Sequence, residues 1–263
     1  MSEPLLRVEG LVKLYAGVRA VDGLSYAVAP GTITGLIGPN GSGKSTSIDC
    51  LTGFQPADAG RWWLDGTEVT RHRSHELARL GFTRTFQTVR AYGSLSLIDN
   101  LCLAAQAHDR VGWGGAILRS GALREAEGAA RRRAAELLEL VGLSRLADAP
   151  AEILSYGQSK LLAITAAMMA EPRLAVLDEP VAGVNPTMVR RIEDVIGEMR
   201  RCGVTFLIVE HNMEFIMRLC QQVIVLESGR KIAEGAPDLI RSDPRVLEAY
   251  IGTPIAPAAA APT

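Results

Sequence analysis

A glycine-rich segment near residue 40 has the residue types and spacing of a phosphate-binding loop. It fits the pattern GxxxxGK[ST] in full and ends with Lys44 and Ser45. Glycines let the backbone wrap closely enough for successive N–H groups to point at one anion. Lys44 adds a positive charge for the β- and γ-phosphates of a nucleoside triphosphate, and the Ser45 hydroxyl can bind Mg²⁺. We expect the triphosphate to contact Gly38, Pro39, Asn40, Gly41, Ser42, Gly43, Lys44, Ser45 and Thr46.

Two adjacent carboxylates, Asp178 and Glu179, lie at the end of a short apolar run later in the chain. In open parallel sheets, ligands bind beyond the carboxyl ends of the strands. Asp178 can therefore reach the magnesium ion, and Glu179 can polarise a water molecule for attack on the γ-phosphate. Taken alone, the pair could also be an acidic helix cap after a buried strand. Beside a complete phosphate loop, the catalytic interpretation is favoured.

The elements that must position these residues alternate between apolar and amphipathic runs, which is typical of α/β proteins. A strand over 32–37 is expected to enter the loop, and a helix over 44–52 to leave it. Apolar residues at helical spacing predict an amphipathic helix over 187–201. Continuously apolar runs, typical of strands covered on both faces, predict further strands over 174–178, 204–210 and 223–226.

Two parts of the chain depart from this alternation. The first 30 residues and residues 60–69 indicate a small antiparallel β layer, in which Trp62 and Trp63 are packing residues. The middle, roughly 91–146, is rich in Ala, Leu and Arg, and 124–141 has one apolar face. We interpret it as an inserted helical subdomain.

Composition limits the classes of function. The chain has 263 residues, 48% of them hydrophobic, and a formal net charge of −1, which gives no electrostatic case for nucleic acid as the main partner. Its four cysteines show no CxxC spacing, which is typical of reduced thiols. We find neither a signal peptide at the N-terminus nor an apolar run of ~20 residues, the length of a membrane span. A role at a membrane therefore requires docking onto another chain.

Four further segments lie in the order found in ABC transporter ATPases, and the chain resembles that family over roughly 5–253. Leu154–Gln158 resembles the ABC signature sequence, about twenty residues before the acidic strand end. Phe86-Gln87 resembles the Q-loop, and Glu210-His211 resembles the segment with the switch histidine. Tyr15 resembles the aromatic residue that stacks on adenine.

The resemblance implies a role for each of these residues. Gln87 would contact the attacking water or Mg²⁺, and His211 would hold the γ-phosphate. Tyr15 would stack on the base, and Ser155, Gly157 and Gln158 would bind the nucleotide of a facing subunit. From the residues alone, simpler interpretations stay open. Ser155 fits a plain helix cap, a lone histidine after a strand is more often structural, and Tyr15 fits a strand-end packing residue.

The resemblance also implies the fold. It predicts an α/β P-loop NTPase (RecA-like) core, with the antiparallel layer and the helical subdomain added to it. We expect a single ABC-type ATPase domain over 1–253. Its core would comprise 1–87 and 160–253, and its helical subdomain 88–159. Residues 254–263, an Ala/Pro tail, are expected to be disordered.

In this family, the signature of one subunit closes over the phosphate loop of another. Because the chain carries one of each motif, the resemblance implies a dimer that buries two ATP molecules. The D-loop position holds Asn185 where Asp is usual, so the contact across the dimer can differ. The resemblance implies membrane permease subunits and, indirectly, a periplasmic substrate-binding protein as further partners. It places the chain at the cytoplasmic face of the bacterial inner membrane.

One subgroup matches in more detail. Tyr156 replaces the first signature glycine, and this variant resembles the larger ATPase of branched-chain amino acid importers, whose partner is a related, shorter ATPase. The segments 83–87, 94–101 and 243–252 carry the same resemblance. Where that family has arginines after the signature, this chain has Ser159-Lys160.

Other classes of function stay open. ATPases of urea or amide importers are very similar, and those of lipid or lipopolysaccharide exporters are somewhat less so. A small-molecule kinase would share only the phosphate loop. DNA-repair members split their motifs around a long coiled coil, and translation members usually carry two ATPase domains. This sequence has neither.

Overall fold

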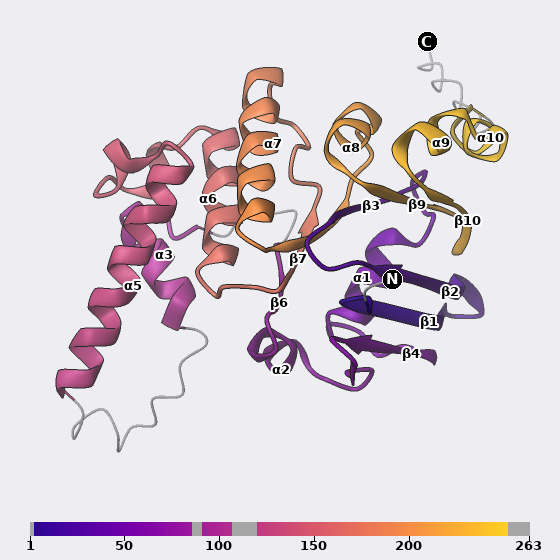
Figure 1. The fold of residues 1–263 in the computed structure, drawn as a ribbon, viewed down its shortest axis with the longest axis horizontal. Coiled ribbons are helices and arrows are strands. Elements are labelled where there is room, and N and C mark those ends of the chain that lie inside the picture. Colours follow the sequence, from indigo (N-terminus) through magenta and orange to yellow (C-terminus); the bar gives the residue numbers. More distant parts are fainter. Residues whose placement is uncertain (1–2, 86–90, 107–119, 252–263) are drawn as a thin grey trace, which may run out of the picture.

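The computed structural model describes residues 3–85, 91–106 and 120–251. It places a mostly parallel sheet between a helical region on one face and a smaller antiparallel sheet with two short helices on the other (Figure 1). The larger sheet has six strands in the order β10-β9-β3-β8-β7-β6. These strands are β3 (Ile33–Ile37), β6 (Phe82–Arg84), β7 (Leu174–Asp178), β8 (Thr205–Val209), β9 (Gln222–Glu227) and β10 (Arg230–Gly235).

The central strands form where the sequence is continuously apolar. Every residue of β3, β7 and β8 is buried, because both faces of the sheet are covered. Successive side chains point to opposite faces, so Val176 belongs to the core beneath the antiparallel sheet while Leu177 belongs to the core beneath the helices. The strands predicted from the sequence are confirmed, and β7 has the predicted bounds. Only β10 runs antiparallel to its neighbour.

The smaller sheet has the order β2-β1-β4-β5 and is antiparallel, as predicted. Its strands are β1 (Leu6–Tyr15), β2 (Val18–Val28), β4 (Ala59–Leu64) and β5 (Thr67–Glu68). Trp62 packs in its core, whereas Trp63 lies on the other face, with the Arg7 guanidinium 4.1 Å from its ring centroid. Helix α1 (Lys44–Leu51) shares the core that contains Trp62.

Most of the other helices lie on the opposite face and at the ends of the six-stranded sheet, whereas Leu77 of α2 (Ser74–Arg79) packs in the same core as α1 (Figure 1). The middle region forms α3 (Leu97–Gln106), α5 (Ser120–Leu140) and α6 (Tyr156–Met168). The apolar face predicted for 124–141 is buried at Ala134, Leu137, Leu138 and Val141. The remaining helices are α7 (Pro186–Arg201), α8 (Met213–Leu219), α9 (Pro237–Ser242) and α10 (Pro244–Ile251), and 3₁₀ turns lie at Ser144–Leu146 and Ala151–Ile153.

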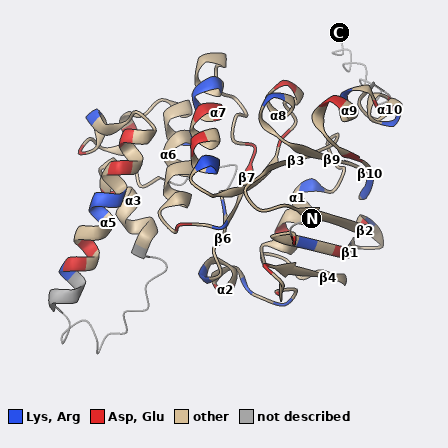
Figure 2. Ribbon diagram, in the orientation of Figure 1, with Lys and Arg blue, Asp and Glu red and all other residues tan. Residues whose placement is uncertain are grey.

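In α7, arginines lie toward the two ends of the helix and the acidic residues lie between them (Figure 2). Within the described ranges, no helix is both long enough and apolar enough to cross a bilayer. The predicted tail, 254–263, lies outside the described residues.

Candidate functional site

The phosphate loop connects the buried strand β3 to helix α1, as its motif requires. Gly38 and Gly43 have positive φ angles of 151° and 96°. A Cβ atom on Gly38 would lie 2.1 Å from the Leu226 carbonyl oxygen, and one on Gly43 would lie 2.3 Å from that of Ala20. Only glycine fits these close approaches, so the loop is held against its neighbours by backbone packing.

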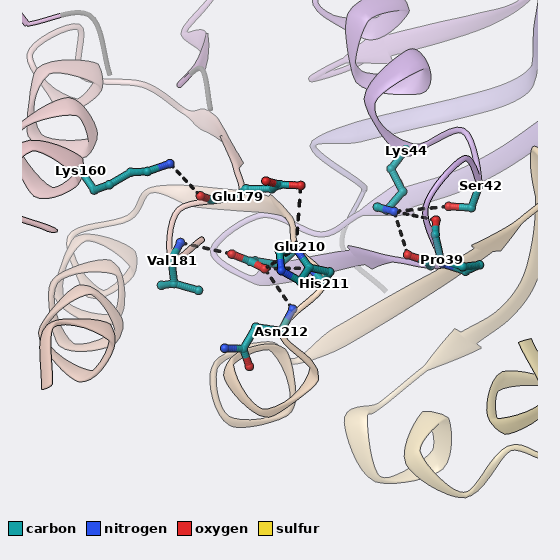
Figure 3. Close-up of polar contacts among 10 residues, drawn as sticks. Pro39, Ser42, Lys44, Lys160, Glu179, Val181, Glu210, His211 and Asn212 are labelled. Atoms are coloured by element: carbon teal, nitrogen blue, oxygen red, sulfur yellow. Dashed lines mark hydrogen bonds and ion pairs between the residues drawn. The ribbon is translucent and has the colours of Figure 1, made fainter. Parts of the chain in front are cut away.

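Lys44 is folded over its own loop (Figure 3). Its Nζ donates to the carbonyl oxygens of Gly38 at 2.7 Å and Pro39 at 3.0 Å. Burial lowers the pKa of the Lys44 ammonium, and the charges of Glu179 and Asp178 partly offset that effect. Both carboxylates are thus near enough to act on the ammonium electrostatically, and a phosphate group bound at the loop would bring Lys44 a further anionic partner.

Asp178 and Glu179 lie at the carboxyl end of β7, in different environments. Asp178 is nearly buried, and its Oδ2 accepts a hydrogen bond from Arg84 Nη2 at 2.8 Å. Glu179 is half-buried and has a φ of 47°, in the left-handed region that a non-glycine residue rarely adopts. Such strain is concentrated at functional sites. It turns the chain sharply after the strand, at the residue predicted to activate water.

Hydrogen bonds from both sides hold the backbone of Glu179. Its N–H donates to the Val209 carbonyl oxygen at 2.9 Å, and its own carbonyl oxygen accepts from Lys160 Nζ at 3.0 Å (Figure 3). Lys160 is buried, 3% exposed, and belongs to α6. The lysine at the position where the family usually has arginine is therefore used within the chain, as an anchor for the residue that follows Asp178.

His211 reaches the same end of the sheet from β8. Its Nδ1 lies 3.8 Å from Glu179 Oε1 and 3.5 Å from Glu210 Oε2, and its side chain is 59% exposed (Figure 3). Exposure leaves the ring accessible to a ligand. The sequence prediction placed His211 and Glu179 at one site, and the structure brings them together.

Glu210 is a positioning residue that the sequence interpretation did not single out. Its side chain is fully buried, and its carboxylate accepts hydrogen bonds from the backbone N–H groups of Val181, His211 and Asn212. It thus ties the loop after Glu179 to the loop that carries His211 (Figure 3). One feature of the sequence could have pointed to Glu210, namely that it is a carboxylate at the end of a continuously apolar strand. A buried carboxylate needs hydrogen-bond donors such as backbone N–H groups.

The remaining predicted residues lie at separate places. Tyr15 is exposed at the end of β1, and its hydroxyl donates to Gln55 Oε1 at 2.8 Å, so its ring borders open space. Ser155 caps α6, in a reciprocal capping box with Gln158. No hydrogen bond or ion pair among the described residues joins 155–158 to the phosphate loop. Gln87, predicted near water or metal, lies outside the described residues.

Gly157 and Asn185 fix the contact between α6 and the helix that follows the acidic strand. A Cβ on Gly157 would lie 2.6 Å from Met188 Cγ, so a side chain there would separate α6 from α7. Asn185 Oδ1 accepts the Met188 N–H at 2.9 Å and caps α7. The asparagine at the D-loop position thus performs the capping that an aspartate would also perform.

The donor set suits magnesium rather than a transition metal. The described residues contain no group of three or more His, Cys, Asp or Glu arranged for a metal ion. Mg²⁺ is usually bound by one or two carboxylates together with substrate phosphates and water, without a complete protein cage. The Asp178 carboxylate and the exposed Ser45 hydroxyl offer oxygen ligands of this kind.

Comparison with known proteins agrees with this geometry. A family profile described as "ABC transporter" matches residues 21–182. The chain belongs to the ABC transporter ATPase family. A second profile, described as "Branched-chain amino acid ATP-binding cassette transporter", matches residues 230–256.

Two curated relatives cover almost the whole chain. BraF of Pseudomonas aeruginosa, a "high-affinity branched-chain amino acid transport ATP-binding protein", is 38% identical over 96% of this chain and 99% of its own length. LivG of Escherichia coli, described in the same words, is 36% identical over the same shares. The expected resemblance to ATPases of that kind is confirmed.

Solved structures share the fold. A nucleotide-free ATP-binding cassette from an ABC transporter has a TM-score of 0.83 and 36% identity, over 95% of this chain and 100% of the other. An ATP-binding cassette in its ADP conformation has a TM-score of 0.84 at the same identity and coverage. The predicted α/β ABC-type ATPase fold is therefore confirmed.

Proposed function

We propose that this chain binds and hydrolyses MgATP as the ATPase subunit of an importer for branched-chain or related amino acids. The observation that carries the ATPase part is the meeting of Lys44, Asp178, Glu179 and His211 at one end of the six-stranded sheet. The relatives BraF and LivG, similar over nearly their full lengths, support the amino-acid part. The profile match at 230–256 supports it independently of the catalytic motifs.

In this proposal the loop amides and Lys44 bind the β- and γ-phosphates, and the exposed Tyr15 ring stacks on adenine. The Ser45 hydroxyl and the Asp178 carboxylate hold Mg²⁺, which neutralises charge developing on the phosphate oxygens when it is bound. Glu179 accepts a proton from the attacking water, with its backbone fixed from both sides. His211, adjacent to Glu179, donates a hydrogen bond to the γ-phosphate. Gln87 contributes from the Q-loop.

The proposed active unit is a head-to-tail dimer with a second ABC ATPase, either another copy or a shorter relative. At the start of α6, Ser155 is exposed and Gln158 is half-buried, whereas Gly157 is buried against α7. Among the described residues, Ser155 and Gln158 make no hydrogen bond with the phosphate loop of their own chain. They are therefore available to the nucleotide of a facing subunit. The α6 N-terminus would place backbone N–H groups at its phosphates.

An apolar groove supports docking of membrane permease subunits. It has a volume of about 520 Å³ and lies between α2, α3 and α6. Its wall includes the large exposed side chains Phe54, Tyr92 and Leu103. An amphipathic helix of a permease would bury these side chains. We propose that this chain is thereby held at the cytoplasmic face of the inner membrane and receives signals from a periplasmic binding protein through the permease.

Closure of the dimer would then move the helical subdomain, 88–159, with its permease. A direct test combines this chain with its permease and companion ATPase in proteoliposomes. Uptake of labelled leucine that depends on ATP and stops with Lys44→Ala supports the proposal. Phosphate release without any transport of branched-chain amino acids would point instead to the urea or amide importers. Failure to release phosphate without an acceptor metabolite would indicate a kinase.

A further inference from the structure

Arg84 ends the edge strand β6, and its charged side chain is 8% exposed. Its guanidinium forms two ion pairs. Nη2 lies 2.8 Å from Asp178 Oδ2, and Nη1 lies 2.5 Å from Asp49 Oδ1. Nη1 also lies 3.3 Å from the Thr52 hydroxyl. A buried cation with two carboxylate partners is a specific arrangement, because each charge must be compensated once water is removed.

The two carboxylates belong to the two halves of the proposed catalytic site. Asp49 is in α1, which begins at Lys44 directly after the phosphate loop. Asp178 is the last residue of β7, where the metal ligand is expected. One planar guanidinium thus fixes the distance between the phosphate-binding helix and the acidic strand. Lysine, with a single ammonium, lacks the forked donors that this bridge uses.

The geometry also leaves one oxygen of Asp178 available. Arg84 engages Oδ2, while in the described part of the chain no hydrogen-bond donor reaches Oδ1. A carboxylate held at one oxygen keeps its other oxygen in a defined direction. Metal-ligating carboxylates are commonly fixed in this way by hydrogen bonds from outside the metal site.

Arg84 also borders the apolar groove. It contributes to the groove wall, and the Phe54 ring centroid lies 5.7 Å from the guanidinium carbon. The aromatic ring covers one side of the cation and limits its access to water. The guanidinium therefore lies between the groove and Asp178.

We propose that Arg84 is a positioning residue for the metal ligand, and that it orients Asp178 toward Mg²⁺ while anchoring it to α1. This inference rests on the proposed function, since it takes Asp178 to be the metal ligand. Removing the arginine has two opposite consequences. Loss of a positive charge would strengthen the local attraction for Mg²⁺, whereas loss of orientation would weaken metal binding. Because separate guanidinium nitrogens hold Asp178 and Asp49, we expect the loss of orientation to dominate.

The test is a Mg²⁺ titration of nucleotide binding, followed with a fluorescent ATP analogue on the full chain. The half-saturating Mg²⁺ concentration is measured for the wild type, Arg84→Gln and Arg84→Lys, with affinity in EDTA recorded separately. We expect Arg84→Gln to raise that concentration by roughly 10-fold or more, as for other residues that orient metal ligands. Arg84→Lys keeps the positive charge but loses the paired guanidinium donors. We expect its half-saturating Mg²⁺ concentration to remain several-fold above that of the wild type.

Arg173→Gln is the matched control. Arg173 Nη1 lies 2.7 Å from Asp65, but this ion pair is about half exposed and lies away from the nucleotide site. The control should leave the Mg²⁺ titration unchanged. An unchanged or lower half-saturating concentration in Arg84→Gln, or full recovery in Arg84→Lys, would overturn the inference. If the wild type itself binds the analogue equally well with and without Mg²⁺, the assignment of the metal site fails instead.

Discussion

Lys160 Nζ lies 3.0 Å from the backbone carbonyl oxygen of Glu179, and this contact joins the helix that begins at Ser155 to the proposed catalytic base. Because Glu179 has a left-handed backbone, its side-chain direction depends on such restraints. Movement of α6 on dimer closure would be transmitted through Lys160 to the residue that activates water.

Substitution Lys160→Met should therefore lower kcat while nucleotide affinity changes little. A hydrogen bond from a charged donor contributes about 1.5–3 kcal/mol, which corresponds to a loss of roughly tenfold or more in rate if it is realised in the transition state. Phosphate release at saturating ATP measures kcat, and a fluorescent analogue measures affinity. Lys160→Arg, which retains a donor, should recover most of the rate. Equal kcat values for Lys160→Met and the wild type would show that the contact is not used in catalysis.

Substitution Glu179→Gln should separate binding from hydrolysis. The amide keeps the shape of the side chain but cannot accept the proton of the attacking water. We expect MgATP to bind and the dimer to remain closed, as measured by sedimentation with and without ATP. Turnover near that of the wild type would rule out Glu179 as the base.

Substitution Lys44→Ala should abolish tight MgATP binding, because it removes the positive charge facing the phosphates. The half-buried ammonium donates to loop carbonyl oxygens, so the variant also loses contacts within the loop. Equilibrium binding of a labelled nucleotide provides the measurement. An affinity equal to that of the wild type would contradict the assignment of the phosphate site.

Gly157→Ala should destabilise the fold by about 1–3 kcal/mol, because the added methyl group would collide with Met188 at the α6–α7 contact. Gly197→Ala is a control in α7, where an added Cβ meets no atom within 4 Å. It should stabilise the protein by roughly 0.5–1 kcal/mol through helix propensity. Denaturant unfolding of both variants gives the free energies. Equal changes in the free energy of unfolding for the two variants would indicate that Gly157 does not lie this close to Met188 in solution.

Cysteine reactivity should follow burial. Burial raises the pKa of Cys50 to about 11 and that of Cys220 to about 12, whereas Cys202 is exposed. A raised pKa keeps a thiol protonated and unreactive at about pH 8, and this protection persists until the pH approaches the raised value. A thiol reagent should therefore modify Cys202 in the native protein, and Cys50 and Cys220 only after unfolding. Rapid native modification of Cys220 would contradict its burial.

The order of elements was predictable because local patterns determine it. Continuous apolar runs identified β7, β8 and β9, the approach to the phosphate loop identified β3, and Ser155 fitted the cap at the start of α6. The partners of the polar side chains were not predictable. Arg84 meets Asp178 across 94 residues of sequence, and neither residue type indicates its partner. Such pairs depend on which strands become neighbours, and hydropathy does not specify that order.

The central claim is that a triphosphate bound by the loop around Lys44 is closed over by the Ser155 region of a facing subunit. A structure of the Glu179→Gln assembly with MgATP, including the companion ATPase where one is required, tests it most directly. We predict γ-phosphate oxygens within about 3 Å of a signature serine hydroxyl or N–H group of the facing subunit. A γ-phosphate that contacts only the loop of its own chain, with the second subunit distant, would contradict the claim.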